Sequence, residues 1–452
     1  MMQVKKHNHW RVAIWMFLVI HTLIVVGFWM WKLTVRHALD CGELEVLNAV
    51  YWWKRGIAPP YPQIDQIPTF ANHYGPVYEA LCAFLPSFGH PYFIGRVISL
   101  LAAVTLLFAV ALWVFCWTRN WTCGWLAVLF LLTAKPIFSF GILHRVDMLA
   151  VMLSMLGFVL VLLTRHWLTA VIGAILMGIG FHTKLTAVAA PIACILALWN
   201  KERPRALLVG AVWLALAIGG VVTMQLITNG NYLRHAILGN EPSQWLKPLD
   251  MLTRPLTSSP FWVALAFCAW RSADSYERSA FRAELSYLTA ALMIAGITST
   301  NPGSSWNYLL DFYVALAMMT GRLIWFWLMM QKAIFYNKFI IALLLAHVLF
   351  SIPHTAYFNA KDWASVRRYR KEFVKVEAQL RDVLINSQRI AVLKSGLVMD
   401  VALSYGLPNC IGLPGNMEKQ MENLATKALQ QGQLDLVIIG DTLRVLKARS
   451  AR

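Results

Sequence analysis

Long hydrophobic runs joined mostly by short polar connectors occupy the first three quarters of the chain. Many windows in these runs approach the roughly 20 apolar residues that a helix needs to cross a bilayer. The pattern predicts about eleven membrane-spanning helices, with about ten or twelve as alternatives because several runs are short. The predicted spans are residues 12–33, 92–117, 121–140, 147–164, 167–182, 184–199, 206–228, 257–271, 284–300, 308–331 and 338–353.

The main polar interruption follows the first predicted span directly and covers residues 34–91. Loops of this length in a compact protein are usually functional. After Gly75-Pro76, which favours a turn, a helical run over 77–85 is expected to lie along the outer surface. We therefore interpret the spans as a scaffold that holds this loop over a site at the membrane surface.

The C-terminal part has a different pattern. Residues 361–388 are charged and have apolar positions at helical spacing. Two strand-like runs follow, 390–393 and 434–440, with a helix predicted over 417–431 between them. The sequence thus predicts an all-α polytopic membrane domain, residues 1–353, and a small soluble α/β domain, residues 354–452.

Composition supports this division. Hydrophobic residues make up 58% of the chain and charged residues 14%, which excludes an ordinary soluble protein. The net charge of +18 lies largely in alternate connectors, beginning with Arg119 and Arg165. This distribution follows the positive-inside rule and predicts a multi-pass protein of the inner (plasma) membrane, with a cytoplasmic N-terminus and an extracytoplasmic C-terminus. No basic–aromatic stripe indicates nucleic-acid binding.

Under this topology, polar residues from distant parts of the chain gather at the outer ends of the spans. A position shared by several helix ends is where a helix bundle commonly builds one site. Asp311 lies one helical turn beyond Asn307 and is expected on the same face. The residues concerned are Asp40, Glu43, Glu45, His73, Tyr74, Arg145, Asp147, Lys184, Asn307 and Tyr308.

Two interpretations remain open for the charged members of this set. Asp40 is either a solvated helix-terminal carboxylate or a general base that deprotonates an acceptor. Glu43 could share a proton, position the acceptor or, together with Glu45, bind a divalent metal. Arg145 and Lys184 either pair locally or hold an anion, most plausibly the phosphate of a lipid, since Arg offers a planar fork and Lys a point charge.

The order of short motifs resembles the GT-C superfamily of integral-membrane glycosyltransferases. The similarity covers about residues 1–330 and points to the bacterial branch of protein O-mannosyltransferases and the lipid A aminoarabinose transferase. The motifs are Asp40-x-x-Glu43, Gly56 with Pro60-Tyr61, Tyr74-Gly75-Pro76-x-Tyr78, Arg145-x-Asp147-Met148-Leu149-Ala150, Thr183-Lys184-x-Thr186-Ala187 and Gly303-Ser304-x-x-Asn307-Tyr308.

This resemblance implies a transferase that uses a polyprenyl-phosphate sugar as donor on the extracytoplasmic side. It implies Asp40 as catalytic base and Lys184 and Arg145 as ligands of the lipid phosphate. The spacing of Asp40, Glu43 and Glu45 leaves open which carboxylate is the base and whether a metal is needed. The remaining candidates for contact with the sugar or acceptor are His73, Tyr74, Asp147, Asn307 and Tyr308.

If the acceptor displaces the polyprenyl phosphate in a single step, the transfer inverts the configuration of the sugar's anomeric carbon. The acceptor could be a lipid, a glycan or a protein, and membrane lipids surround the spans. The alternative function is a transporter, flippase or binding protein for lipid-linked sugars without chemistry. Against it, transporters usually carry ionisable or broken-helix elements near the midplane, whereas this chain keeps its polar groups at one end.

Overall fold

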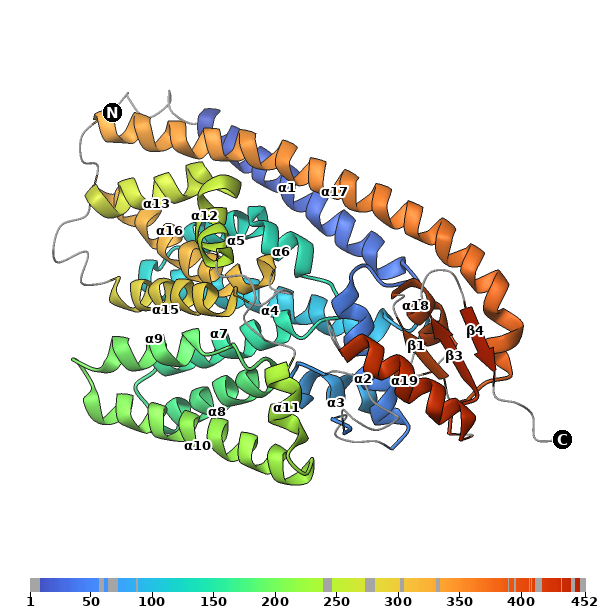
Figure 1. Ribbon diagram of the computed structural model, residues 1–452. Helices are drawn as coiled ribbons and strands as arrows, with labels where there is room; N and C mark the ends of the chain where they lie inside the picture. The colour runs from blue at the N-terminus through green and yellow to red at the C-terminus, as the bar shows by residue number, and fades with distance from the viewer. Residues whose placement is uncertain are drawn as a thin grey trace.

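Helices form most of the molecule, and a small sheet stands at one end (Figure 1). The computed structural model describes residues 9–56, 61–63, 72–86, 88–238, 246–272, 281–300, 305–330, 334–388, 390–393, 396–405, 407, 409–410, 417–431, 433–439 and 444–447. Two parts of the motifs above, Pro60 and Gly303-Ser304, lie outside these residues.

A helix lies at each position where the sequence predicts a membrane span, which confirms a helical polytopic protein. By length and composition, α1, α4 and α10 are long and apolar enough to cross a membrane. The count of eleven spans stays a prediction. The helices are α1 (His9–Thr34), α2 (Cys41–Lys54), α3 (Pro76–Phe84), α4 (Phe93–Thr118), α5 (Trp121–Thr133), α6 (Lys135–Phe140), α7 (Asp147–Leu163), α8 (Trp167–Thr183), α9 (Ala189–Leu198), α10 (Arg203–Ile227), α11 (Asn231–Leu238), α12 (Lys247–Ser258), α13 (Pro260–Ser272), α15 (Arg282–Thr298), the 3-10 helix η1 (Trp306–Leu309), α16 (Leu310–Met330), α17 (Ile334–Ile385), α18 (Gly396–Ser404) and α19 (Met417–Gln430).

Two predicted segments differ in extent from the helices of the structure. The predicted span 121–140 is divided into α5 and α6, because Ala134 adopts an extended conformation and Pro136 cannot donate a backbone hydrogen bond to the preceding turn. In contrast, no break follows residue 353. The last predicted span and the charged helical stretch form one helix, α17, of 52 residues.

The predicted outer loop 34–91 contains two short helices. Asp40 caps α2, since its side chain accepts a hydrogen bond from the amide of Glu43. Pro76 begins α3, a favourable place for proline because the first-turn amides have no partner within the helix. The sequence predicted α3 within one residue at each end but did not predict α2.

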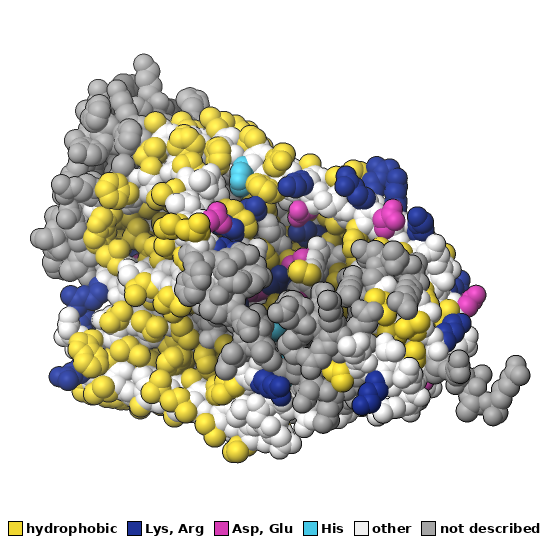
Figure 2. Space-filling model, viewed as in Figure 1, with side chains coloured by type: hydrophobic (Ala, Val, Ile, Leu, Met, Phe, Trp, Pro, Cys, Tyr) yellow, Lys and Arg dark blue, Asp and Glu magenta, His cyan; other side chains and the backbone are white. Residues whose placement is uncertain are grey.

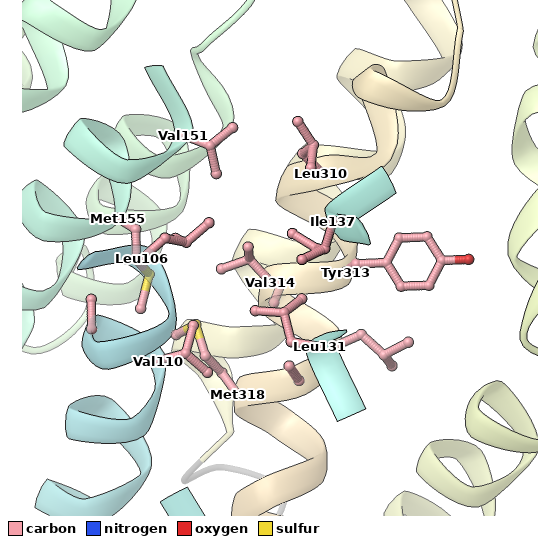
Figure 3. Close-up of a cluster of buried hydrophobic side chains, with 14 of the residues drawn as sticks. Leu106, Val110, Leu131, Ile137, Val151, Met155, Leu310, Tyr313, Val314 and Met318 are labelled. Carbon is pink, nitrogen blue, oxygen red and sulfur yellow. The ribbon is translucent and has the colours of Figure 1, made fainter. Parts of the chain in front are cut away.

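The membrane domain has a close-packed apolar core between α4, α5, α7 and α16, where side chains such as Leu106, Val151 and Val314 meet (Figure 3). At Gly157 of α7, an added Cβ would lie 2.4 Å from the carbonyl oxygen of Gly173 in α8, so this helix crossing requires glycine. In Figure 2, hydrophobic side chains cover the part of the visible face over α8, α9 and α10, as expected for a surface in contact with lipid.

The C-terminal sheet has the strand order β2-β1-β3-β4. Strands β1 (Ile390–Leu393) and β3 (Leu436–Ile439), as well as helix α19, lie where the sequence predicts them. Strands β2 (Asn409–Cys410) and β4 (Arg444–Lys447) and helix α18 were not predicted. β1 pairs in parallel with β2 and β3, and β4 runs antiparallel to β3.

The C-terminal sheet packs against residues of the segment 34–91 rather than standing apart. Leu44 and Leu47 of α2 share an apolar cluster with Leu380 of α17 and with Val398 and Met399 of α18. In Figure 1, α1 and α17 run side by side along one edge of the molecule and lead to this cluster. The division into two domains at residue 353 and the outer position of the second stay predictions.

Candidate functional site

Five of the predicted site residues meet in one network of hydrogen bonds and ion pairs. Arg145 Nη1 lies 2.6 Å from Asp40 Oδ2, and Arg145 Nε lies 3.0 Å from Asp147 Oδ2. Lys184 Nζ lies 2.6 Å from Asp147 Oδ1. The side-chain amide of Asn307 donates to the same Asp147 oxygen at 2.8 Å. Residues from four separate segments of the chain therefore converge, as the sequence predicted.

Helix ends place three of these charges. Asp40 is the N-cap of α2, and Asp147 is the first residue of α7, so both carboxylates lie at the positive end of a helix dipole. Lys184 is the C-cap of α8, where a cation is favoured. Local sequence thus favours each position, and the ion pairs join them.

The members of the network differ in exposure. The side chain of Asp147 is 1% exposed, those of Arg145 and Lys184 are each 11% exposed, and that of Asp40 is 26% exposed. Two cations and two carboxylates also make the group neutral as a whole. Asp40 is therefore the carboxylate of this network that a substrate can reach most easily.

Asp40 borders a cavity of about 550 Å³. Lys32, Lys135, Trp306 and Asp362 also border it, from α1, α6, η1 and α17. Lys32 is paired, since its Nζ lies 3.3 Å from Asp362 Oδ2.

Lys135 differs from Lys32. Its Nζ lies 4.4 Å from the ring centroid of Trp306 and 3.8 Å from that of Phe358, in cation–π geometry. Within the part of the chain that the structure describes, Lys135 forms no ion pair with a carboxylate. It is a cation at the cavity wall that is still available to an anionic ligand. The sequence analysis missed it because it falls inside a predicted span.

Glu43 has a different environment from Asp40. Its side chain is fully buried, and Oε1 accepts hydrogen bonds from Arg96 Nε at 2.9 Å and from the His144 amide at 2.7 Å. Oε2 accepts from Arg96 Nη2 and from the Leu39 amide, both at 2.7 Å. Burial raises the pKa of Glu43, but the Arg96 charge and these hydrogen bonds outweigh it and lower the pKa to about 2.

The divalent-metal site at Glu43 and Glu45, which the sequence left open, does not fit this arrangement. Both Glu43 oxygens already accept two hydrogen bonds each, so neither is available as a ligand. Glu45 is half-buried, and burial raises its pKa, with His73 and Arg145 opposing the shift. Among the described residues, no three His, Cys, Asp or Glu side chains form a group that could hold a metal ion.

The aromatic candidates lie near the network, but His73 does not join it. Arg145 Nη2 donates to the Tyr74 hydroxyl at 3.4 Å, and Lys184 Nζ lies 4.4 Å from the ring centroid of Tyr308. His73 Nδ1 instead lies 3.3 Å from the carbonyl oxygen of His235 in α11.

Asp311 and Asn307 also have different partners. The hydroxyl of Tyr287 in α15 donates to Asp311 at 2.5 Å, whereas Asn307 donates to Asp147. Asp311 therefore does not bond directly to the network, although the Lys184 charge acts on it, and its place on the same face as Asn307 stays a prediction.

Arg96 is the main residue of this region that the sequence analysis missed. It lies in the first turn of α4 and donates to Glu43 and to the carbonyl oxygens of Lys32 and His37. It thereby joins the end of α1 to the start of α2. A charged residue inside an apolar span is costly and needs a partner, which was the available signal.

Comparison with known proteins supports the fold. No protein-family model and no curated protein matches this sequence. The crystal structure of ArnT from Cupriavidus metallidurans bound to undecaprenyl phosphate superposes with a TM-score of 0.66 at 12% identity, over 94% of this chain and 93% of ArnT. Apo ArnT gives a TM-score of 0.65 at 12% identity, over 95% and 94% of the two chains. The chain therefore has the fold of ArnT, a GT-C glycosyltransferase, as the motifs predicted.

Proposed function

We propose that this protein is a glycosyltransferase that moves a sugar from a polyprenyl-phosphate donor to an acceptor on the extracytoplasmic face of the membrane. One observation carries the proposal: Asp40, the most exposed carboxylate of the charge network, borders a cavity of about 550 Å³. The fold shared with ArnT, which was crystallised with undecaprenyl phosphate, supports a lipid-linked donor.

Asp40 is the general base in this proposal. Oδ1 is held by the Glu43 amide at 2.9 Å and Oδ2 by Arg145, so the carboxylate has a fixed orientation and keeps lone pairs free. It removes a proton from the acceptor as the acceptor's lone pair attacks the anomeric carbon. The bond from that carbon to the phosphate oxygen breaks, and polyprenyl phosphate departs with the electron pair. Attack opposite the phosphate inverts the anomeric configuration.

Glu43 takes a positioning role. Arg96 and two backbone amides engage both of its oxygens, so it cannot exchange protons with a substrate without losing a buried ion pair. Its own amide holds Asp40 Oδ1. Glu43 therefore fixes the first turn of α2, and Asp40 carries the chemistry.

We assign the donor phosphate to Lys135. Asp40 and Asp147 neutralise Arg145 and Lys184, which leaves these two cations to orient the carboxylates. Lys135 borders the same cavity as Asp40 and forms no direct ion pair with a carboxylate within the described residues. Trp306, against which it packs, supplies an apolar wall beside the charge. A lysine in this position binds phosphate as a point charge.

A transfer assay separates this function from transport or binding alone. Purified protein in nanodiscs is supplied with a panel of radiolabelled polyprenyl-phosphate sugars and a membrane extract as acceptor, and the product's anomeric configuration is determined by NMR. We expect transfer from at least one donor, with inversion. If donors bind or cross the bilayer of proteoliposomes without transfer, the protein is a flippase or binding protein. Transfer with retention would contradict the single displacement.

A further inference from the structure

A second cavity, of about 470 Å³, lies between the outer end of α1 and the part of α17 that extends beyond residue 353. We name it the α1–α17 groove. The residues that define it here are Trp31, Arg36, His37, Trp363, Arg367 and Arg370. It is separate from the cavity at Asp40, although Val366 borders both.

The α1–α17 groove is strongly cationic. Arg36, Arg367 and Arg370 are all exposed, and none of them forms an ion pair with a carboxylate among the described residues. Glu377 is the acidic residue at the groove wall, and its Oε1 accepts a hydrogen bond from the Tyr405 hydroxyl at 3.2 Å. Three guanidinium groups against one carboxylate leave a net positive charge, and the planar guanidinium matches the geometry of phosphate oxygens.

His37 gives an independent sign of a ligand. Its side chain is 3% exposed, and Nδ1 lies 2.9 Å from the Ala38 carbonyl oxygen. A carbonyl only accepts, so Nδ1 carries the proton, and in the neutral ring Nε2 is an acceptor. Nε2 is buried and has no hydrogen-bond partner among the described residues. Buried polar atoms are rarely left unpaired, so a hydroxyl group of a ligand fits here as a hydrogen-bond donor.

The position of the groove indicates a membrane lipid. Trp31 and Trp363 border it, and Trp is enriched where proteins cross the membrane–water interface. Below it, Leu23, Val26 and Met30 of α1 are 66%, 43% and 53% exposed and form an apolar face. A headgroup in the groove would thus stand above a helix surface suited to acyl chains.

From these observations, we propose that the α1–α17 groove binds the phosphate headgroup of an anionic phospholipid. The three arginines supply the guanidinium groups that pair with phosphate oxygens, and the two tryptophans place them at the level of the headgroups. The groove also lies close in sequence to Asp40, because His37 at its wall is three residues before Asp40. Between them, the amide of Ala38 donates to Asp400 of α18 at 2.9 Å. Lipid binding here does not depend on sugar transfer, so it can be tested separately.

The test compares two triple variants of the full-length protein. Arg36→Gln/Arg367→Gln/Arg370→Gln removes the groove cations. Arg368→Gln/Lys371→Gln/Lys375→Gln removes the same charge from exposed positions of α17 that do not border the groove. Binding of phosphatidylglycerol to delipidated protein is measured by native mass spectrometry, with phosphatidylcholine as the zwitterionic control. Melting temperatures confirm folding, and the single variants Arg36→Gln and Arg370→Gln replace the triple variant if it does not fold.

We expect the groove variant to bind phosphatidylglycerol about 10-fold or more weakly and the α17 control variant to change it by less than about 3-fold. Phosphatidylcholine should bind weakly to all forms. Equal losses in both variants would mean that only the general surface charge acts, and would overturn the proposal. Displacement of the lipid by millimolar inorganic phosphate would reassign the groove to a soluble anion.

Discussion

Glu43 and Asp40 stand one helical turn apart at the start of α2, and each pairs with an arginine at a similar distance, 2.7 Å to Arg96 and 2.6 Å to Arg145. Their surroundings differ completely. Glu43 is 0% exposed and accepts four hydrogen bonds, whereas Asp40 is 26% exposed and borders a cavity. An acidic residue with a basic partner is therefore not enough to indicate chemistry. Free lone pairs at a cavity make the difference.

The buried pair has a structural task that the accessible pair lacks. Arg96 donates to a backbone carbonyl at the end of α1 as well as to Glu43. Glu43 in turn accepts from the amide of Leu39, which precedes Asp40, and from that of His144, which precedes Arg145. The Glu43–Arg96 pair therefore holds together the segments that present Asp40. Of the four predictions below, those for Glu43 and Asp40 test these separate roles, and those for Lys135 and Asp400 test the surroundings of Asp40.

The largest expected effect is on folding. Glu43→Gln leaves the Arg96 guanidinium buried without a counter-charge and should lower the free energy of unfolding by about 3–5 kcal/mol. Chemical denaturation in detergent measures the change. As a control, Glu43→Gln/Arg96→Met removes both charges and should recover part of the loss. A Glu43→Gln protein that is as stable as wild type but inactive would assign Glu43 to the chemistry and would contradict its structural role.

A smaller effect is expected on donor binding. Lys135→Gln removes the cation assigned to the phosphate and should raise the donor KM about 10- to 100-fold, since hydrogen bonds to charged groups contribute about 1.5–3 kcal/mol. The turnover number should change little. Lys375→Gln, which removes an exposed lysine of α17 that does not border the cavity, is the matched control. An unchanged KM in Lys135→Gln, together with a raised KM in folded Lys184→Gln, would show that Lys184 rather than Lys135 binds the donor phosphate.

The smallest effect concerns a third carboxylate, Asp400, which accepts from the Ala38 amide and, at 2.5 Å, from the Tyr92 hydroxyl. Burial, opposed by these hydrogen bonds, raises its pKa to about 6. The folded state thus binds this proton more tightly than the unfolded chain. The stabilisation is present below about pH 4 and is lost as the pH rises through about 6.

Asp400→Asn stays neutral at every pH and isolates this contribution. Between pH 4 and pH 7, wild type should lose about 1–3 kcal/mol of unfolding free energy relative to the variant. Denaturation of both proteins at the two pH values measures the difference. A difference that stays constant with pH, or that moves in favour of wild type, would show that Asp400 does not dock the sheet domain on the Ala38 segment as a protonated group.

The sequence predicted most of the helices because crossing a bilayer imposes a local, nearly continuous apolar pattern. It missed the helix break at Pro136, which depends on a single backbone donor. It also did not show that the last apolar span and the charged helical stretch after it form one continuous helix, α17. Charged residues at helix ends were recognisable for the same local reason, and Asp40 and Asp147 were found in this way.

The local hydrophobic pattern could not predict which residues from distant segments pair with one another. Glu43 and Arg96 lie 53 positions apart, and nothing local distinguishes Glu43 from Asp40. Lys135 was not predicted as a site residue because the residues around it have the pattern of one continuous span, whereas the structure divides this span into α5 and α6. The side chains of the sheet domain that reach Ala38, above all Asp400, come from the far end of the chain and have no local signal.

The most direct test of the central claim, that Asp40 is the base, is single-turnover sugar transfer by Asp40→Asn. Asparagine caps a helix about as well as aspartate, so α2 should form and the variant should fold and bind donor like wild type. We predict a transfer rate about 10²- to 10⁴-fold lower, the usual contribution of a positioned general base. A folded Asp40→Asn protein that transfers sugar at the wild-type rate would contradict the account.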